Sequence, residues 1–233
     1  MYLYETHVHT SPLSACGRAT SKETLDYYKS AGYAGVFMTN HFIDGNCRYD
    51  LHDLPYEERI RAFFADQDEA VEYGKTIGLD VFSAFEMSYK GTDFLIYGID
   101  AEWCIAHENM HEIKKSTLLT MLKEDGALII QAHPYREDPW IDHIRLYPRH
   151  VHGVEIFNAC RWDFDNEFSA LYCKYYGLIP FAGSDNHIGE KRPVFGGMAT
   201  ETPIIDATDF KNKVLSGEAK PFRKDENGVT ILV

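Results

Sequence analysis

The sequence predicts an α/β fold built as a single domain, and three observations lead to this prediction. Short apolar runs alternate with longer amphipathic stretches along the 233 residues, and glycines follow most of the amphipathic stretches. The sequence contains no internal repeat and no Gly/Ser/Pro-rich linker. Apolar strands that are separated by helices are typical of buried parallel strands. A barrel and a doubly wound sheet both fit this pattern.

Each element follows from its local pattern. The runs with the length and apolar composition of strands cover 2–7, 34–39, 80–86, 93–98, 127–132, 153–158 and 179–183. The amphipathic stretches predict helices over 21–31, 56–77, 105–125, 163–176 and 206–215. Ser21 stands where the first helix needs an N-cap. The glycines expected to end helices in a left-handed conformation are Gly32, Gly78, Gly126 and Gly177.

Composition excludes several classes of protein. The net charge of −13 at pH 7 argues against a nucleic-acid partner held by basic patches. A small anionic substrate stays compatible with it, because bound cations reverse the local field. No apolar run approaches the roughly 18 residues that a membrane span needs, and the first residues lack the pattern of a secretory leader. The five cysteines never form a CxxC pair, so we expect reduced thiols and a cytoplasmic protein.

Metal-ligating residue types stand at the ends of the predicted strands. In α/β folds with parallel strands, chemistry is found at the carboxyl ends of the strands. Five separate strands deliver such residues at that end, which scattered surface histidines would not do. These residues are His7 and His9 after 2–7, His41 after 34–39, Glu86 at the end of 80–86, His133 after 127–132, and Asp185 and His187 after 179–183.

The histidine pairs differ in where they stand. Residues two apart on a strand point to the same face, so His7 and His9 are able to chelate one ion. Chance produces such pairs in a chain with 11 histidines, and His150/His152 is a second one, placed before its strand and not after it. The sequence HENMH at 107–111 matches the zinc-protease pattern HExxH, but the strand-end residues form a more complete alternative.

Two further residues are candidate ligands. Asp93 begins a strand, and the short segment after Glu86 predicts a hairpin-like antiparallel return that places Asp93 beside the end of 80–86. Cys16 lies in a loop and offers a thiolate to a borderline-soft metal. Asn40 is expected to orient a ligand and not to bind metal.

Arginines near these motifs are candidate phosphate clamps, because a guanidinium binds phosphate through two parallel hydrogen bonds. Arg18 and Arg161 are the preferred candidates. Arg136 and Arg192 are also close in sequence to the motifs. Each of the four can equally be an ordinary surface charge.

Taken together, these motifs resemble the PHP (polymerase and histidinol phosphatase) family of metal-dependent phosphoesterases. The matching pieces are HVHT at 7–10, TNH at 39–41, Glu86, AHP at 132–134, GVEIFN at 153–158 and GSDNH at 183–187. The resemblance extends to about residue 200 and leaves 201–233 as a closing segment of a domain that spans 1–233. It implies a distorted (β/α)7 TIM-like barrel with a metal site at its C-terminal rim.

The resemblance also implies how two or three divalent ions (Zn, Mn or Fe) would be held. One ion would take His7, His9, Glu86 and Asp185, and Glu86 would bridge to a second ion that His133 also binds. A third would take His41 and His187. Family members often carry histidine where Asp93 stands, and an aspartate there is still able to ligate. They usually have Asp or His in the loop after HVHT, where this chain offers only Ser14 or Cys16.

The expected activity is therefore hydrolysis of a small phosphorylated metabolite, a phosphate monoester, by a metal-activated water, as in a histidinol-phosphatase-like enzyme. His187 or His41 would protonate the leaving group, and Arg18 and Arg161 would hold the phosphate. The alternatives are a phosphodiesterase or exonuclease of the same family, an amidohydrolase-type enzyme, and a non-catalytic metal-binding module. The sequence leaves the substrate and the oligomeric state open.

Overall fold

The structure is a computed structural model that describes residues 1–187 and 193–232, and its centre is one ten-stranded sheet. The order of strands across the sheet is β10-β9-β8-β1-β2-β3-β4-β5-β6-β7. The strands are β1 (Tyr2–Glu5), β2 (Gly35–Met38), β3 (Asp80–Tyr89), β4 (Thr92–Tyr97), β5 (Leu128–Ala132), β6 (Gly153–Asn158), β7 (Ile179–Gly183), β8 (Phe195–Thr200), β9 (Lys220–Asp225) and β10 (Gly228–Ile231).

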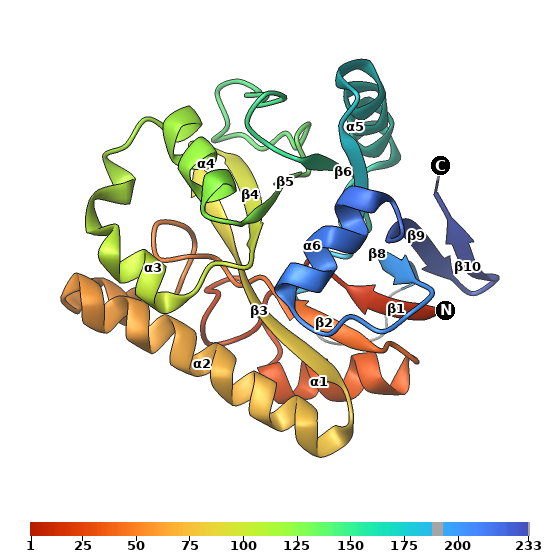
Figure 1. The fold of residues 1–233 in the computed structure, drawn as a ribbon, viewed down its shortest axis with the longest axis horizontal. Coiled ribbons are helices and arrows are strands. Elements are labelled where there is room, and N and C mark those ends of the chain that lie inside the picture. Colours follow the sequence, from red (N-terminus) through yellow and green to blue (C-terminus); the bar gives the residue numbers. More distant parts are fainter. Residues whose placement is uncertain (188–192, 233) are drawn as a thin grey trace.

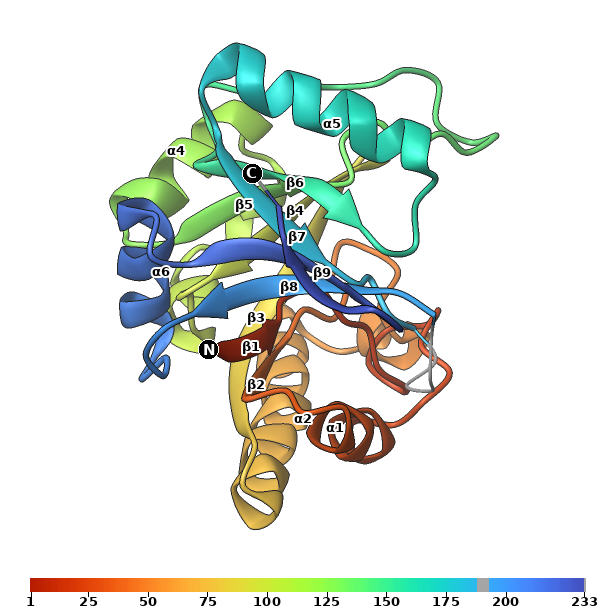
Figure 2. The same ribbon diagram turned by 90° about the vertical axis from the view of Figure 1, so that its right-hand side faces the viewer.

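Helices surround this sheet (Figure 1). They are α1 (Ser21–Ser30), α2 (Tyr56–Ile77), α3 (Ala101–Ala106), α4 (Lys115–Glu124), α5 (Asp163–Tyr176) and α6 (Ala207–Ser216), with short 3-10 turns at Tyr49–Asp53 and Glu108–His111. The long α2 runs along one side with α1 beside it, α3 and α4 follow on the next side, and α5 lies at the outer edge near β6 (Figures 1 and 2).

The strand predictions are confirmed for the first seven strands, and so is the antiparallel return after Glu86. β3 pairs with β4 in antiparallel fashion, with Ser88 opposite Asp93. β1-β2-β3 and β5-β6-β7 are parallel, whereas β4 is antiparallel to both of its neighbours. The strands β8, β9 and β10 were not predicted, and they add an antiparallel extension beside β1. The sheet is therefore mixed and not purely parallel.

The prediction of one helix over 105–125 is wrong. The chain leaves helical geometry at His107, with φ −119° and ψ 46°, and passes through the turn at Glu108–His111 before α4 begins at Lys115. This break buries Met110 in the core, with Ile113 packed against that core. The prediction failed because the apolar residues keep the helical period through the whole stretch, whereas tertiary packing bends the chain in its middle.

The sheet curls around a shared interior. One cluster of buried side chains draws residues from most of the strands and is completed by Phe210 and Val214 of α6. At the far ends of the curl, β7 approaches β8 so closely that a Cβ on Gly196 would lie 2.4 Å from the Gly183 carbonyl oxygen. The Gly196 N–H donates to Ser184 Oγ at 2.9 Å. Glycine is thus required where the ends of β7 and β8 meet, and this contact brings the loop after β7 next to that after β1.

Two properties of the chain as a whole bear on its environment. Among the described residues, none of the helices combines the length and the apolar character that crossing a bilayer requires. None of the five cysteines forms a disulfide bond in the part of the chain that the structure describes.

Helix α1 begins at Ser21, as the predicted range 21–31 has it, but its N-cap is Thr20 and not Ser21. The Thr20 side chain accepts from the Glu23 N–H at 3.2 Å, and the Glu23 carboxylate accepts from the Thr20 N–H at 2.8 Å. This reciprocal pair satisfies two backbone donors that a helix start otherwise leaves open.

We therefore predict that Thr20→Ala lowers the free energy of unfolding by about 1 kcal/mol, because it removes the cap. Chemical denaturation followed by circular dichroism measures this change. Ser21→Ala is the matched control and should change stability by less than about 0.5 kcal/mol. An equal or larger loss from Ser21→Ala would show that the capping assignment is wrong.

Candidate metal centre

The strand-end residues predicted as ligands come together at one place in the structure. Glu86 lies at their centre. Its Oε1 is 3.3 Å from His7 Nε2 and 3.2 Å from His133 Nε2, and its Oε2 is 3.5 Å from His9 Nε2 and 2.8 Å from His41 Nδ1. These four imidazoles follow β1, β5 and β2, so residues far apart in sequence meet around one carboxylate.

Asp185 forms the second acidic centre of the cluster. Its Oδ1 lies 3.3 Å from His9 Nε2 and 3.6 Å from both His7 Nε2 and His187 Nδ1. Asp185 and His133 both adopt positive φ angles, +52° and +25°. Non-glycine residues rarely do so, and strain of this kind concentrates at functional sites.

The Glu86 carboxylate is buried, and neither of its oxygens has a hydrogen-bond partner among the described residues. Nearby imidazole nitrogens face it without hydrogen-bond geometry. Burial raises the pKa of Glu86, but the positive charges expected on His41 and His7 outweigh it and hold that pKa well below its usual range. An ionised, buried carboxylate without hydrogen bonds is costly, and a bound cation removes that cost.

The ligand atoms fall into three overlapping groups, and within each group they lie no more than 4.8 Å apart. The first group is His7, His9 and Asp185, the second is His7, Glu86 and His133, and the third is His9, Cys16, His41 and His187. Imidazole, carboxylate and thiolate are the donor types that divalent transition metals take in proteins. The residues present therefore fit metal ions.

Hydrogen bonds fix the ring nitrogens that face the cluster. His7 Nδ1 lies 2.8 Å from Glu155 Oε1, and a carboxylate only accepts, so Nδ1 carries a hydrogen and Nε2 is the ring nitrogen that faces Glu86. Ser14 Oγ donates to Asn40 Oδ1 at 2.8 Å and lies 3.3 Å from His9 Nδ1. Ser14 therefore accepts from His9, whose Nε2 likewise faces the cluster. Oriented histidines of this kind are typical of metal sites.

Sequence reasoning missed the residues that do this positioning. Glu155 also accepts from the His133 N–H at 3.0 Å, and Glu5 Oε1 accepts from the backbone N–H groups of His7 and Ser184. Burial raises the pKa of Glu5 despite these bonds. One signal was available: both glutamates interrupt apolar strands, which is the same argument that singled out Glu86. Asn40 does orient this region, as expected, since its Oδ1 also accepts from the Thr10 N–H.

Asp93 lies at the margin of the cluster. Its Oδ2 is 4.0 Å from His133 Nε2 and 3.0 Å from a terminal nitrogen of Arg136, and it is in none of the three groups. Burial, followed by the charge of Glu86, raises the pKa of Asp93. Arg136, which the sequence offered only as one of four candidates, is thus drawn into the site.

The arginines differ in their distance from the cluster. A terminal nitrogen of Arg161 is 3.7 Å from Asp185 Oδ2, so this side chain borders the site. The side chain of Arg18 is exposed, although its backbone N–H donates to the His187 carbonyl oxygen at 2.7 Å. Arg192 lies outside the described residues.

Cys16 joins the cluster on its open side. Burial raises the pKa of this thiol, but hydrogen bonds to His187 and His41 lower it overall, to about 6. A cavity of about 480 Å³ opens over this side of the cluster. Its walls include Cys16, His41, Asp93, Arg136, Trp140 and His187.

The other histidine pairs stand apart from the cluster. His107 Nδ1 lies 2.7 Å from the Trp103 carbonyl oxygen, and its ring stacks on Trp103. His111 faces Asp44 at 3.8 Å. HENMH therefore lacks the convergent third ligand of a zinc-protease helix. His152 Nδ1 accepts from the Ile129 N–H at 3.1 Å, far from the strand ends that carry the cluster.

The fold and the cluster together define an α/β protein with a buried cluster of histidines and carboxylates that fits metal ions. No protein-family model and no curated protein matches the sequence. Solved structures do resemble it. A two-domain protein from Bacteroides vulgatus that contains a predicted PHP-like metal-dependent phosphoesterase is 14% identical, with a TM-score of 0.67 over 94% of this chain. The chain spans 64% of the length of that protein.

Two further structures cover most of both chains. A protein from Bifidobacterium adolescentis, described provisionally as a metal-dependent phosphoesterase, is 13% identical, with a TM-score of 0.55 over 91% of this chain and 95% of its own. An amidohydrolase from Chromobacterium violaceum, solved with sulfate and without metal, is 15% identical, with a TM-score of 0.54 over 93% and 96%. At these identities the likeness establishes the fold. That fold is the one found in PHP-like metal-dependent phosphoesterases, as the sequence motifs predicted.

The second HxH pair gives a test of the assignment of His152 as a buried neutral residue. Burial lowers the pKa of His152 to about 4. Because the unfolded state binds a proton near pH 6.5 and the folded state does not, this residue makes stability fall as the pH drops from about 6.5 toward 4.

His152→Gln should reduce the slope of the free energy of unfolding against pH by about 1 kcal/mol per pH unit. Denaturant unfolding between pH 7 and 5 measures this slope. His150→Gln is the control, since His150 sits at the surface beside Thr120. If both variants keep the wild-type slope, His152 is not the buried neutral group that we describe.

Proposed function

We propose that the protein is a metal-dependent phosphoesterase that hydrolyses a small phosphate monoester. The observation that carries the proposal is the buried Glu86 carboxylate, whose oxygens have no hydrogen-bond partner among the described residues and face the Nε2 atoms of His7 and His133 at 3.3 and 3.2 Å. A closely spaced set of divalent ions at such a carboxylate activates water and neutralises the charge of a phosphoryl group. Both phosphoesterases among the structural neighbours support this class of reaction.

The donor atoms support two or three ions. His7, His9, Glu86 and Asp185 would hold the first, and Glu86 would share the second with His133, with Asp93 at its margin. His41 and His187 would hold the third, with Cys16 in the place where PHP proteins usually have Asp or His. Thiolate with imidazole favours zinc over manganese or iron at this third position.

The chain's own residues would bind the phosphate and supply the proton. Arg161 borders Asp185, and Arg136 reaches the cavity wall, so both guanidinium groups flank the position of a phosphate over the cluster. Arg18 would reach it from the loop beside His187. His187 donates through Nδ1 to the Asp185 carbonyl oxygen at 2.7 Å, so its Nε2 would hold the third ion or, when that position is empty, protonate the leaving-group oxygen. His41 is the second candidate donor under the same condition.

The cavity volume of about 480 Å³ and the net charge of −13 favour a small phosphorylated metabolite over a nucleic acid. We further interpret the curled sheet as a distorted TIM-like barrel formed by residues 1–233, and the lack of disulfide bonds among the described cysteines as a sign of a reducing, cytoplasmic environment. An amide substrate is the second candidate, because one structural neighbour is named an amidohydrolase.

The activity test combines substrates with variants. Protein supplied with Zn²⁺, Mn²⁺ or Fe²⁺ should release phosphate from monoesters, and Glu86→Gln should lower kcat/KM at least about 1,000-fold, because a shared ligand is lost. His150→Gln should leave the rate unchanged. Faster turnover of diesters or amides would redirect the proposal. No turnover with any substrate would favour a non-catalytic metal-binding module, and full activity of Glu86→Gln would refute the catalytic assignment.

Ligation by Cys16 has a spectroscopic signature. Protein loaded with Co²⁺ should show a thiolate-to-cobalt charge-transfer band in the near ultraviolet, and Cys16→Ser should abolish it. The matched control is Cys160→Ser, because Cys160 is the other half-buried thiol near the cluster, with Sγ 3.0 Å from the Asp185 carbonyl oxygen. A band that survives Cys16→Ser and disappears in Cys160→Ser would assign the ligand to Cys160.

A further inference from the structure

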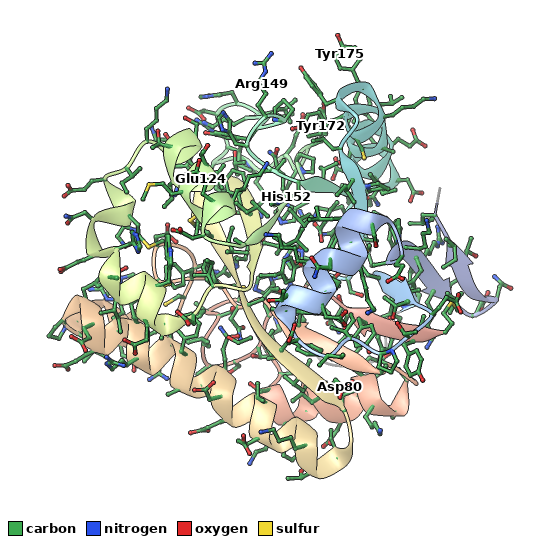
Figure 3. All side chains as sticks on the ribbon, in the orientation of Figure 1. Asp80, Glu124, Arg149, His152, Tyr172 and Tyr175 are labelled. Atoms are coloured by element: carbon green, nitrogen blue, oxygen red, sulfur yellow. The ribbon has the colours of Figure 1, made fainter. Side chains whose placement is uncertain are left out.

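One side of α5 exposes large apolar side chains to solvent. The exposed fractions are 57% for Phe164, 40% for Phe168, 61% for Leu171 and 82% for Tyr175. In Figure 2 the helix runs along the outer edge of the molecule, and Figure 3 shows Tyr175 projecting outward from it. Large apolar residues gathered on one exposed face mark interaction sites in proteins that are not otherwise membrane-bound.

The spacing of these residues is that of a helix-pairing seam. Successive positions 164, 168, 171 and 175 are separated by four, three and four residues, which places them in one narrow stripe along α5. The face next to the stripe is buried and includes Asp165, Ser169 and Tyr172. The helix therefore presents one face to the fold and a separate apolar stripe to the outside.

Charged residues border the stripe along one edge. Glu167 and Lys174 are both exposed, stand seven residues apart, and occupy the same position relative to the seam. In an antiparallel helix pair these flanking positions face each other across the seam, whereas in a parallel pair they face the opposite flank. In α5 the opposite flank holds Tyr172, which is buried within its own fold.

We propose that α5 is the interface of a homodimer, in which the α5 helices of two copies pack antiparallel about a two-fold axis. One register satisfies the whole pattern: Phe164 packs opposite the second copy's Tyr175, and Phe168 opposite its Leu171. The same register places Glu167 beside the second copy's Lys174, and the two-fold axis repeats every one of these contacts. The charge pattern thus selects a second copy as the occupant of the face.

The exposed surface is of the size that a dimer needs. Two further exposed aromatic residues stand at the ends of α5: Trp162, directly before the helix, is 81% exposed, and Tyr176, its last residue, is 48% exposed. An aromatic side chain covers about 150–250 Å² when buried, so the six residues offer several hundred Å² per copy, close to the roughly 800 Å² per partner in stable interfaces. Apolar grooves lie on both sides of Leu171, one lined by Tyr135 and Leu146 and the other by Ile156 and Pro180. These grooves would receive the ridge of the second helix.

Sedimentation velocity of the purified full chain at micromolar concentration tests the proposal. The wild type should sediment as a dimer, and Leu171→Glu should weaken association at least about 100-fold, because it places two charges at the centre of the seam. Ile205→Glu is the control, since Ile205 is 80% exposed and precedes α6, away from α5. It should remain dimeric. Unchanged circular dichroism of each variant excludes unfolding.

A charge exchange tests the orientation of the helices. Glu167→Lys alone and Lys174→Glu alone each create two like-charge contacts and should weaken the dimer about tenfold, whereas the double exchange should restore it. A monomeric wild type, or a dimer that survives Leu171→Glu, would overturn the interface. A double exchange that associates no better than the single variants would overturn the antiparallel register.

Discussion

The burial of Glu86 is the constraint on which the rest of the site depends. An ionised carboxylate inside a protein loses its hydration, and here no hydrogen bond within the described residues replaces that hydration. Among the described residues, the electrostatic effect of imidazoles such as His41 and His7 compensates for this loss and holds the pKa of Glu86 low. The arrangement is stable only if positive charge stays at the cluster, on protonated histidines or on cations.

The surrounding residues make cations the better solution. The interior around the cluster also buries Glu5, Asp93, Glu155 and Asp185. Glu155 and Ser14 accept hydrogen bonds from the Nδ1 atoms of His7 and His9, so the Nε2 atom of each ring faces the cluster. Two histidines held in this way repel one another when protonated. A divalent ion instead accepts both lone pairs and offsets the carboxylate charge, so the positioning residues favour metal over protons.

The sequence predicted those parts of the fold and of the cluster that depend on local interactions. The ends of β1, β2, β3, β5 and β7 were predictable, because a polar ligand directly after an apolar run is visible in the chain itself. Strands β8, β9 and β10 were not predicted: β8 pairs with β1, which is distant in sequence, and the adjacent pair β9 and β10 was missed because its alternation is weak. The break between α3 and α4 depends on the burial of Met110 in the core, which periodicity does not register. Glu155 and Ser14 act through contacts with His7 and His9 that only the folded chain shows.

Helix α5 connects the two conclusions that we draw from the structure. On its inner side Asn166 accepts a hydrogen bond from the Asn158 N–H at 2.9 Å and donates to the Asn158 carbonyl oxygen at 3.2 Å. The Asn158 side chain in turn donates to Glu155 at 3.1 Å and reaches Asp185 at 3.3 Å. The position of α5 therefore bears directly on the residues that orient the cluster. A helix that is held on its outer face by a second copy loses freedom to shift. Pairing through that face would therefore restrict the range of positions of the side chains around Asp185, because Asn166 positions Asn158 only as accurately as α5 itself is held.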